Sequence, residues 1–281
     1  MATKIKITGN TKMDKSTIKS ILTFAAISIV PNISNAQQPE YNPNDWHGII
    51  AMGVMATSDY EGSNDYRILP LPFISISKGN YSIRTEGPGV AINIIDNANF
   101  NAGPVVAYRG ERDNDVKDSL VKRLTTINSS VEAGGFISYG INLDKPGERI
   151  EASIKGLYDV GNAHNGYTVT GSLSYRTVIE RKYSIGITAS TTYGNEKYNN
   201  TYFGVSSADA LISGLPQYNA DSGIKDVGAT ATIGYQFNNK WGVMVIGNYT
   251  KLLSPAKDSP LITAVGDTNQ FFGGTAVTYR F

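Results

Sequence analysis

The sequence predicts an all-β fold, a transmembrane antiparallel β-barrel of about twelve strands with short periplasmic turns and long outer loops. Three observations predict it. Apolar and polar residues alternate with a period of two in many segments, the last of these segments ends the chain on Phe281, and no apolar segment after residue 36 approaches the length of a membrane helix. A chain that crosses a bilayer as strands must close into a barrel, because the hydrocarbon offers no water to an open edge.

The amino end has the features of a secretory signal peptide over residues 1–36. Five lysines precede a short apolar core at 21–30, and the small-residue site Ser34-Asn35-Ala36 follows it. The core is too short to span a bilayer as a helix, which needs roughly 20 residues. We therefore expect Sec-type export with cleavage after Ala36 and a location in the outer membrane of a Gram-negative bacterium. Either Met1 or Met13 can be the true start, since the whole signal lies after Met13.

The mature chain predicted by this cleavage has 245 residues, with 20 basic and 23 acidic side chains and a formal charge of −3. This length suits one domain, so we expect a periplasmic segment at 37–45 followed by a barrel at 46–281. The absence of cysteine excludes a disulfide scaffold. The charge balance gives no indication of a nucleic-acid partner.

The clearest alternation lies at 167–176, 183–193 and 227–237, with Tyr or Phe at segment ends where an aromatic girdle would meet the headgroups. The final segment alternates in the same way, and we predict that Tyr279 and Phe281 form the barrel assembly signal. The expected strands lie at 46–58, 67–77, 81–86, 89–95, 99–109, 129–142, 148–159, 166–177, 181–193, 224–237, 240–253 and 268–281.

The connections between these strands alternate in length, as in bacterial barrels whose chain ends lie in the periplasm. The expected periplasmic turns are short, at 78–80, 96–98, 143–147, 178–180 and 238–239. The expected outer connections include every long loop, at 59–66, 87–88, 110–128, 160–165, 194–223 and 254–267. Splitting 81–95 at Gly87-Pro88-Gly89 preserves this alternation; the alternative is a ten-stranded wall with a distorted hairpin.

Charged residues at inward positions are predicted to line the lumen. They are Arg84, Glu86, Arg109, Glu132, Glu151, Lys155, Asp159, Arg176 and Arg280. Both signs occur, and side chains largely fill a barrel of twelve strands. We therefore favour a plugged structural barrel whose charges pair with one another, over a narrow solute channel in which Glu132→Gln or Arg176→Gln would change conductance.

The sequence gives little support to catalysis, and we predict no catalytic, cofactor-binding or metal-binding residues. Only two histidines occur, and a nucleophilic site needs a base held beside its nucleophile. His47 is expected at the membrane interface and His164 in a solvated loop of turn-forming residues. Asp113 and Asp115 lack the ligand spacing of a calcium loop and are expected in a solvated turn.

Several blocks of the sequence resemble the MipA/OmpV family of outer-membrane proteins, and they cover nearly the whole mature chain. They are Tyr60–Arg67, Leu69–Pro72, Gly103–Val105, Tyr108–Gly110, Tyr202–Val205, Ser213–Leu215 with Tyr218, Ala220–Gly223, Leu252-Leu253, Asp258–Ile262, Gly266, Asn269-Gln270 and Tyr279–Phe281. The resemblance implies an outer-membrane barrel without accepted catalytic residues. It also implies a scaffold that brings a lytic murein transglycosylase together with a penicillin-binding protein.

Three functions follow as hypotheses. The first is this scaffold, embedded in outer-membrane lipids and contacting murein-synthesising and murein-hydrolysing enzymes at the periplasmic face, including 37–45. The second is a surface adhesin acting through 110–128 and 194–223, and the third is the narrow solute channel. The blocks Tyr202–Val205 and Ala220–Gly223 fall in the longest predicted outer loop, where a periplasmic partner could not contact them.

Overall fold

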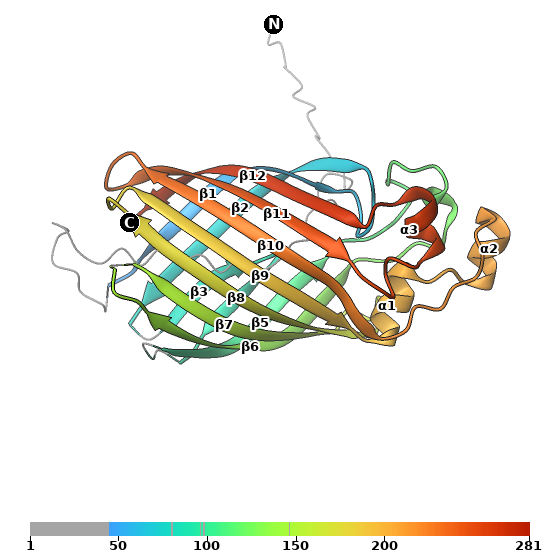
Figure 1. The fold of residues 1–281 in the computed structure, drawn as a ribbon, viewed down its shortest axis with the longest axis horizontal. Helices are drawn as coiled ribbons and strands as arrows, with labels where there is room; N and C mark the ends of the chain where they lie inside the picture. The colour runs from blue at the N-terminus through green and yellow to red at the C-terminus, as the bar shows by residue number, and fades with distance from the viewer. Residues whose placement is uncertain (1–44, 80, 96, 98, 146) are drawn as a thin grey trace, which may run out of the picture.

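The computed structural model describes residues 45–79, 81–95, 97, 99–145 and 147–281. The predicted signal peptide at 1–36 and nearly all of the predicted segment at 37–45 lie outside the described residues. The described chain forms a closed barrel in which every strand pairs antiparallel with its neighbours in sequence and β12 pairs with β1 (Figure 1). The strands are β1 (His47–Ser58), β2 (Tyr66–Lys78), β3 (Tyr81–Glu86), β4 (Gly89–Asn93), β5 (Phe100–Arg109), β6 (Ser130–Asn142), β7 (Arg149–Asp159), β8 (Tyr167–Ile179), β9 (Tyr183–Gly194), β10 (Gly223–Gln236), β11 (Trp241–Leu252) and β12 (Asn269–Arg280).

The count of twelve strands is confirmed, and the ten-stranded alternative is wrong. β3 and β4 are separate short strands joined at Gly87, whose φ of 58° lies in the left-handed region that glycine adopts without strain. Barrel closure includes the end of the chain: the N–H of Phe281 donates to the carbonyl of Gly48 at 3.1 Å, and the N–H of Gly48 donates back at 3.0 Å. The predicted alternation of connections is also confirmed. The short turns lie at the end of the barrel where β1 begins and β12 ends, and the long loops lie at the other end.

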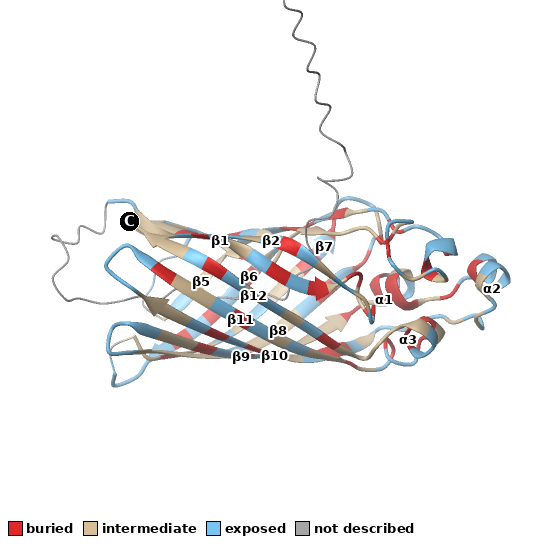
Figure 2. Cartoon of the chain, turned by 90° about the horizontal axis from the view of Figure 1, so that it is seen from above, coloured by how far each residue is buried: buried red, intermediate tan, exposed pale blue. Residues whose placement is uncertain are grey.

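Side chains alternate between the lumen and the outer surface along the strands, and Figure 2 shows buried and exposed bands succeeding one another. Exposed aromatic side chains gather near both ends of the wall, as the girdles of a membrane barrel do. Those near the inner end are Trp46, Tyr81, Phe100, Tyr139, Tyr183, Phe237, Trp241 and Phe281, and those near the outer end are Tyr66, Tyr158, Tyr167, Tyr249 and Phe271. No helix among the described residues is long and apolar enough to cross a membrane.

The outer loops carry short helices that fold over the barrel end opposite the chain terminus (Figure 1). They are η2 (Val121–Arg123), α1 (Glu196–Phe203), α2 (Ser207–Ser213) and α3 (Pro260–Val265). α1 begins at Asn195, whose side chain accepts hydrogen bonds from the N–H of Tyr198 at 3.2 Å and of Tyr167 at 2.8 Å. One residue thus both caps α1 and ties it to the start of β8.

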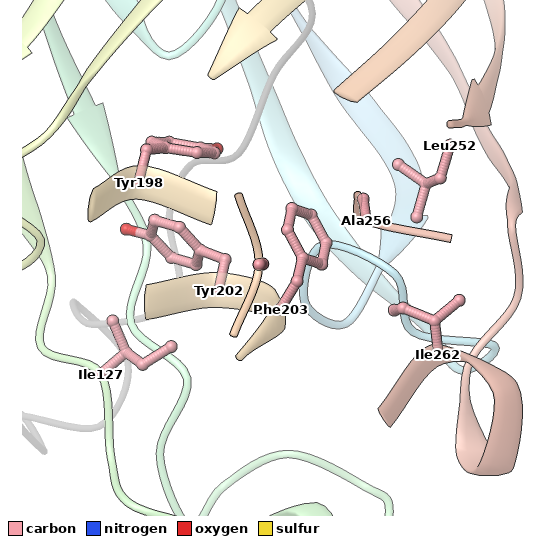
Figure 3. Close-up of a cluster of buried hydrophobic side chains, with 8 residues drawn as sticks. Ile127, Tyr198, Tyr202, Phe203, Leu252, Ala256 and Ile262 are labelled. Atoms are coloured by element: carbon pink, nitrogen blue, oxygen red, sulfur yellow. The ribbon is translucent and has the colours of Figure 1, made fainter. Parts of the chain in front are cut away.

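Two clusters of buried apolar side chains hold these loops together. The first joins α1 to the loops after β5, β9 and β11 and consists of Ile127, Tyr198, Tyr202, Phe203, Ala220, Leu252, Ala256 and Ile262. Figure 3 shows Phe203 turned toward Ala256 and Leu252, whereas Tyr198 and Tyr202 lie together on the other side. The second cluster consists of Tyr60, Val116, Val121, Leu124 and Leu261. Because so many apolar side chains are buried between them, the outer loops pack together into one cap over the barrel end and do not extend separately into solvent.

Within the described residues, the stretch of β2 from Ile68 to Pro72 is an edge that β3 does not pair. At its two ends, the carbonyl of Tyr66 accepts from Lys117 Nζ and the N–H of Ile74 donates to the hydroxyl of Thr85. Gly48 of β1 exchanges backbone hydrogen bonds with the chain end beside β12, so the even-numbered residues of β1 bond to β12 and the odd-numbered ones to β2. Odd-numbered residues of β1 pair with odd-numbered residues of β2. The even-numbered residues of β2 therefore point their N–H and C=O groups away from β1, toward β3. β3, however, pairs only with Ser75–Lys78. Pro70 and Pro72 lie on the remaining edge, and because proline has no N–H they leave no donor unsatisfied there.

Replacing both prolines, as Pro70→Val/Pro72→Val, is expected to create two unpaired N–H donors within the apolar band. An unsatisfied donor in hydrocarbon costs several kcal/mol. The exposed edge of β2 in a second molecule can supply the missing acceptors. We expect a larger oligomeric fraction than wild type by size-exclusion chromatography with light scattering. Ile68→Val, on the same edge but with an unchanged backbone, is the control. If the double variant stays as monodisperse as that control, the assignment of the edge is wrong.

Candidate functional site

The centre of the candidate site is a buried ion pair at the outer end of the lumen. The guanidinium of Arg109, the last residue of β5, donates from Nε to Glu132 Oε1 at 2.9 Å and from Nη2 to Oε2 at 3.1 Å. The side chain of Glu132 on β6 is only 2 % exposed. Two parallel bonds fix the relative orientation of both groups, which a single point contact would not do.

A second cation joins the opposite wall to the same network. Lys225 Nζ on β10 lies 2.5 Å from Glu61 Oε1 and 2.5 Å from Asp226 Oδ2. Glu61, in the loop between β1 and β2, also accepts a hydrogen bond from the hydroxyl of Tyr198 at 2.7 Å and lies 3.9 Å from Arg109 Nη1. One carboxylate therefore connects two walls of the barrel with α1.

The charged form of Glu61 is favoured by these contacts. Burial alone would raise its pKa, but the positive charges of Lys225 and Arg109 and the two hydrogen bonds outweigh burial, and the pKa of Glu61 is lowered below its ordinary value of 4.5. Glu61 thus remains an anion, and a firm attachment for α1, throughout the neutral range.

His164 extends the network and corrects one expectation. Its side chain is 0 % exposed rather than solvated. The N–H of Gly166 donates to Nδ1 at 3.1 Å, so the ring proton lies on Nε2, which donates to Glu132 Oε1 at 3.1 Å. Turn-forming residues predicted a loop here correctly, but Asn162 and Asn165 adopt positive φ and turn that loop back into the barrel mouth.

Asp159 organises the loop that carries His164. Its Oδ1 accepts the hydroxyl of Ser130 and the N–H of Gly161 at 2.9 Å, and its Oδ2 accepts the N–H groups of His164 at 2.6 Å and Asn165 at 2.8 Å. A carboxylate that accepts several backbone donors holds a short loop in one conformation. Asp159 is therefore a positioning residue for His164.

α1 occupies the mouth above these charges. The guanidinium carbon of Arg109 lies 4.8 Å from the ring centroid of Tyr198 and 5.6 Å from that of Tyr202. The ring of His164 meets Tyr198 edge-on at 5.1 Å. Burial raises the pKa of both tyrosines well above the ordinary phenol value, so both remain neutral. The aromatic faces add cation–π attraction to the ion pairs beneath them.

Other loops fix the far end of α1. Arg112 Nη1 donates to the carbonyl of Tyr202 at 3.0 Å, and the hydroxyl of Ser259 donates to the carbonyl of Phe203 at 2.6 Å. A cation at a helix carboxyl end satisfies free carbonyls and complements the helix dipole. Both ends and both faces of α1 are thus held, and the arrangement is suited to closing the barrel mouth.

The other charges predicted for the lumen fall into separate groups. Arg84 Nε and Lys155 Nζ lie 3.3 and 3.4 Å from the carboxylate of Glu86, and Glu151 lies 3.3 Å from Arg149. Arg176 on β8 is in register with Arg149, and Arg280 lies apart, beside a cavity near the inner end. The structure therefore brings Arg109, Glu132 and Asp159 together with His164 but places the remaining predicted residues elsewhere. Tyr279 lies 4.8 Å from Trp241 between ring centroids, and the assembly role of Tyr279 and Phe281 stays a prediction.

Sequence reasoning missed Glu61, Lys225 and Asp226. The register between β9 and β10 shifts between Ile224 and Asp226, and this irregularity buries two consecutive residues, Lys225 and Asp226. Strict alternation sends one of any two consecutive residues outward and so cannot predict both. Glu61 lies in a loop, where no periodicity applies. The described residues contain no group of three or more His, Cys, Asp or Glu side chains placed to hold a metal ion.

Comparisons with known proteins agree with the barrel. A family model described as MltA-interacting protein MipA matches residues 50–281. Outer membrane protein Omp26La of Vibrio anguillarum is 24 % identical over 189 residues, and outer membrane protein OmpV of Vibrio cholerae is 26 % identical over 194 residues; each match covers 67 % of both chains.

Solved barrel structures resemble the chain more loosely. The NanC porin matches with a TM-score of 0.47 at 9 % identity, covering 83 % of this chain and all of that one. An outer membrane channel from Pseudomonas putida F1 matches with a TM-score of 0.46 at 10 % identity, covering 88 % of this chain and all of that one. Nothing about function follows from likenesses of this degree.

Removing the guanidinium in Arg109→Met is expected to leave Glu132 buried without its main partner. Breaking a buried ion pair from one side costs about 3–5 kcal/mol. The free energy of unfolding, measured by denaturant titration in detergent micelles, should fall by about that amount. Arg123→Met, the control, removes an exposed arginine from the outer loops. It should change the free energy of unfolding by less than about 0.5 kcal/mol. Equal effects of the two variants would contradict the network's role.

The lowered pKa of Glu61 predicts a pH-dependent contribution to stability. A carboxylate with a depressed folded-state pKa stabilises the fold fully above its ordinary value of 4.5, and this contribution is lost as pH falls through the lower folded value. Wild type should therefore have a larger free energy of unfolding than Glu61→Gln at pH 7, and the difference between the two should become smaller below pH 4.5. Unfolding titrations from pH 7 to 3 test this, with the exposed Glu180→Gln as control. A gap that stays constant with pH would refute it.

Proposed function

Because this chain belongs to the MipA family of outer-membrane β-barrel proteins, we propose that it is a non-enzymatic scaffold that holds murein enzymes at the outer membrane. The family description, MltA-interacting protein, supports a lytic murein transglycosylase as one partner. A penicillin-binding protein is the second partner implied by the resemblance. Outer-membrane lipids surround the wall.

The observation that carries this proposal is the closed outer mouth. Glu61, Arg109 and Lys225 bind or face α1 from three parts of the barrel, and the loop clusters pack around its other side. A barrel closed this firmly at one end is better suited to present a surface than to pass solutes. Opening the outer mouth would expose several buried charges and break their ion pairs.

The location of the family-like blocks favours a partner at the opposite end. Residues from blocks far apart in sequence meet in the cap: Glu61, Arg109, Tyr202 and Ile262 all belong to the network or to the first apolar cluster. Their role in closing the mouth accounts for these blocks without any contact to a partner. The periplasmic turns are then free to form the docking surface.

Two neighbouring periplasmic turns form an exposed basic rim. The N–H of Gln236 donates to the carbonyl of Lys182 at 2.9 Å, so the turn after β8 lies beside the turn after β10. Arg181, Lys182 and Lys240 are all exposed on these turns. A basic rim attracts a partner surface rich in carboxylates and mainly accelerates its association.

A second candidate function, surface adhesion, is favoured by α2. This helix projects beyond the rest of the cap (Figure 1), and its Leu211 is 89 % exposed. A large apolar side chain this exposed is a suitable contact for another protein.

Affinity capture from detergent-solubilised envelopes tests the scaffold, and a binding assay on host matrix tests adhesion. The folded wild-type chain should recover a lytic transglycosylase or a penicillin-binding protein, and the charge reversals Arg181→Glu, Lys182→Glu and Lys240→Glu together should weaken recovery about tenfold. Leu211→Ser/Ile212→Ser is the matched outer-surface variant and should recover as much as wild type. Recovery of neither enzyme by folded wild type would overturn the scaffold. Loss of binding to host matrix in the α2 variant alone would support adhesion instead.

A further inference from the structure

A cavity of about 190 Å³ with a mixed polar and apolar lining lies in the lumen below the network. Glu61, Arg109 and Lys225 line it, and because the same three residues bind or face Tyr198, α1 forms the cap above. A single water needs only roughly 10–15 Å³ of such space, so the cavity is large enough for a small organic molecule.

Hydroxyl and amide groups dominate one wall of this cavity. They come from inward positions of β8, β9 and β11, namely Thr168, Thr170, Ser172, Ser190, Thr192, Asn248 and Thr250. Thr170 and Thr192 face each other across the β8–β9 pair with 3.3 Å between their hydroxyl oxygens. Each hydroxyl both donates and accepts, so this wall can match a ligand that presents hydroxyl groups of its own.

The charges that line the cavity are already neutralised within the barrel. Lys225 is paired with Glu61 and Asp226, Arg109 with Glu132, and Lys155 with Glu86 at 3.4 Å. An ionic ligand would have to give up its hydration without gaining a free counter-charge. The cavity therefore favours an uncharged polar ligand.

Apolar side chains complete the lining. Leu157 of β7, Leu252 at the end of β11 and Phe272 of β12 lie among the cavity residues. A polyhydroxylated ring has hydroxyl groups at its rim and C–H groups on its faces, so it can contact both kinds of wall at once.

We propose that this cavity binds a small neutral polyhydroxylated molecule of monosaccharide size. α1 closes the outer mouth, so the ligand approaches from the periplasmic end, where two smaller cavities of about 20 and 50 Å³ lie along the lumen. The site goes beyond the scaffold proposal, because it uses the lumen rather than the turns.

Saturation-transfer NMR and equilibrium dialysis on the purified, folded chain in detergent test the proposal, with D-glucose as the neutral probe and glucosamine and glucose 6-phosphate as charged probes. Wild type should bind glucose saturably and more tightly than either charged analogue. Thr170→Val/Thr192→Val removes two cavity hydroxyls at constant side-chain shape and should weaken glucose binding about tenfold. Ser190→Ala provides a milder second variant with a smaller loss in the same direction.

The matched control for binding at equilibrium is Ser174→Ala/Thr188→Val, which removes a hydroxyl pair 3.0 Å apart on the same two strands, outside the 190 Å³ cavity and beside the smaller cavity of about 20 Å³. Glucose binding should be unchanged in this variant. No saturable glucose binding by folded wild type, equal losses in both double variants, or tighter binding of a charged analogue would each overturn the proposal. None of these outcomes alters enzyme capture by the periplasmic turns, so the two proposals fail independently.

Discussion

The bidentate pair between Arg109 and Glu132 is the interaction on which the outer half of the structure depends. Arg109 ends one strand, and its guanidinium simultaneously binds Glu132, faces the rings of Tyr198 and Tyr202 and lies near Glu61. Charges buried in a lumen persist only when their partners surround them. The loops that supply those partners must therefore fold inward, and this constraint converts long outer connections into a cap.

The cap also explains why the family-like blocks are scattered along the chain. The blocks that contain Glu61, Arg109, Tyr202 and Ile262 lie up to about 200 residues apart in sequence, yet they belong to the charge network or to the apolar cluster around Phe203. Their common property is position in the closed mouth. The docking proposed for the periplasmic end is thereby separated along the barrel from the cap at the outer end.

Most of the fold could be predicted from the sequence because period-two alternation, turn residues and connection lengths are local signals that agree with one another. They correctly predicted the split at Gly87-Pro88-Gly89 and the closing strand that ends on Phe281. Prolines within strands were the discordant signals, namely Pro70 and Pro72 in β2 and Pro104 in β5. Pro70 and Pro72 are compatible with β2 because its neighbour β3 is too short to need their missing donors.

The site was less predictable, for physical reasons that differ between residues. Lys225 and Asp226 both face inward because of a register shift, which alternation cannot anticipate. His164 is buried because two asparagines with positive φ turn its loop inward, and the pairing of Asp159 with loop N–H groups is visible only in three dimensions. Alternation did place Arg109 and Glu132 on the same inward face, but it could not identify the loop carboxylate and the helix that complete their surroundings.

Planar-bilayer recording shows whether α1, held by this network, closes the lumen. Wild type should show no discrete conductance steps, whereas Tyr198→Ala/Tyr202→Ala, which removes the rings over Arg109 while leaving the strands unchanged, should show them. Wild-type steps as frequent and as large as those of the double variant would contradict the account, because α1 would then not be what closes the barrel.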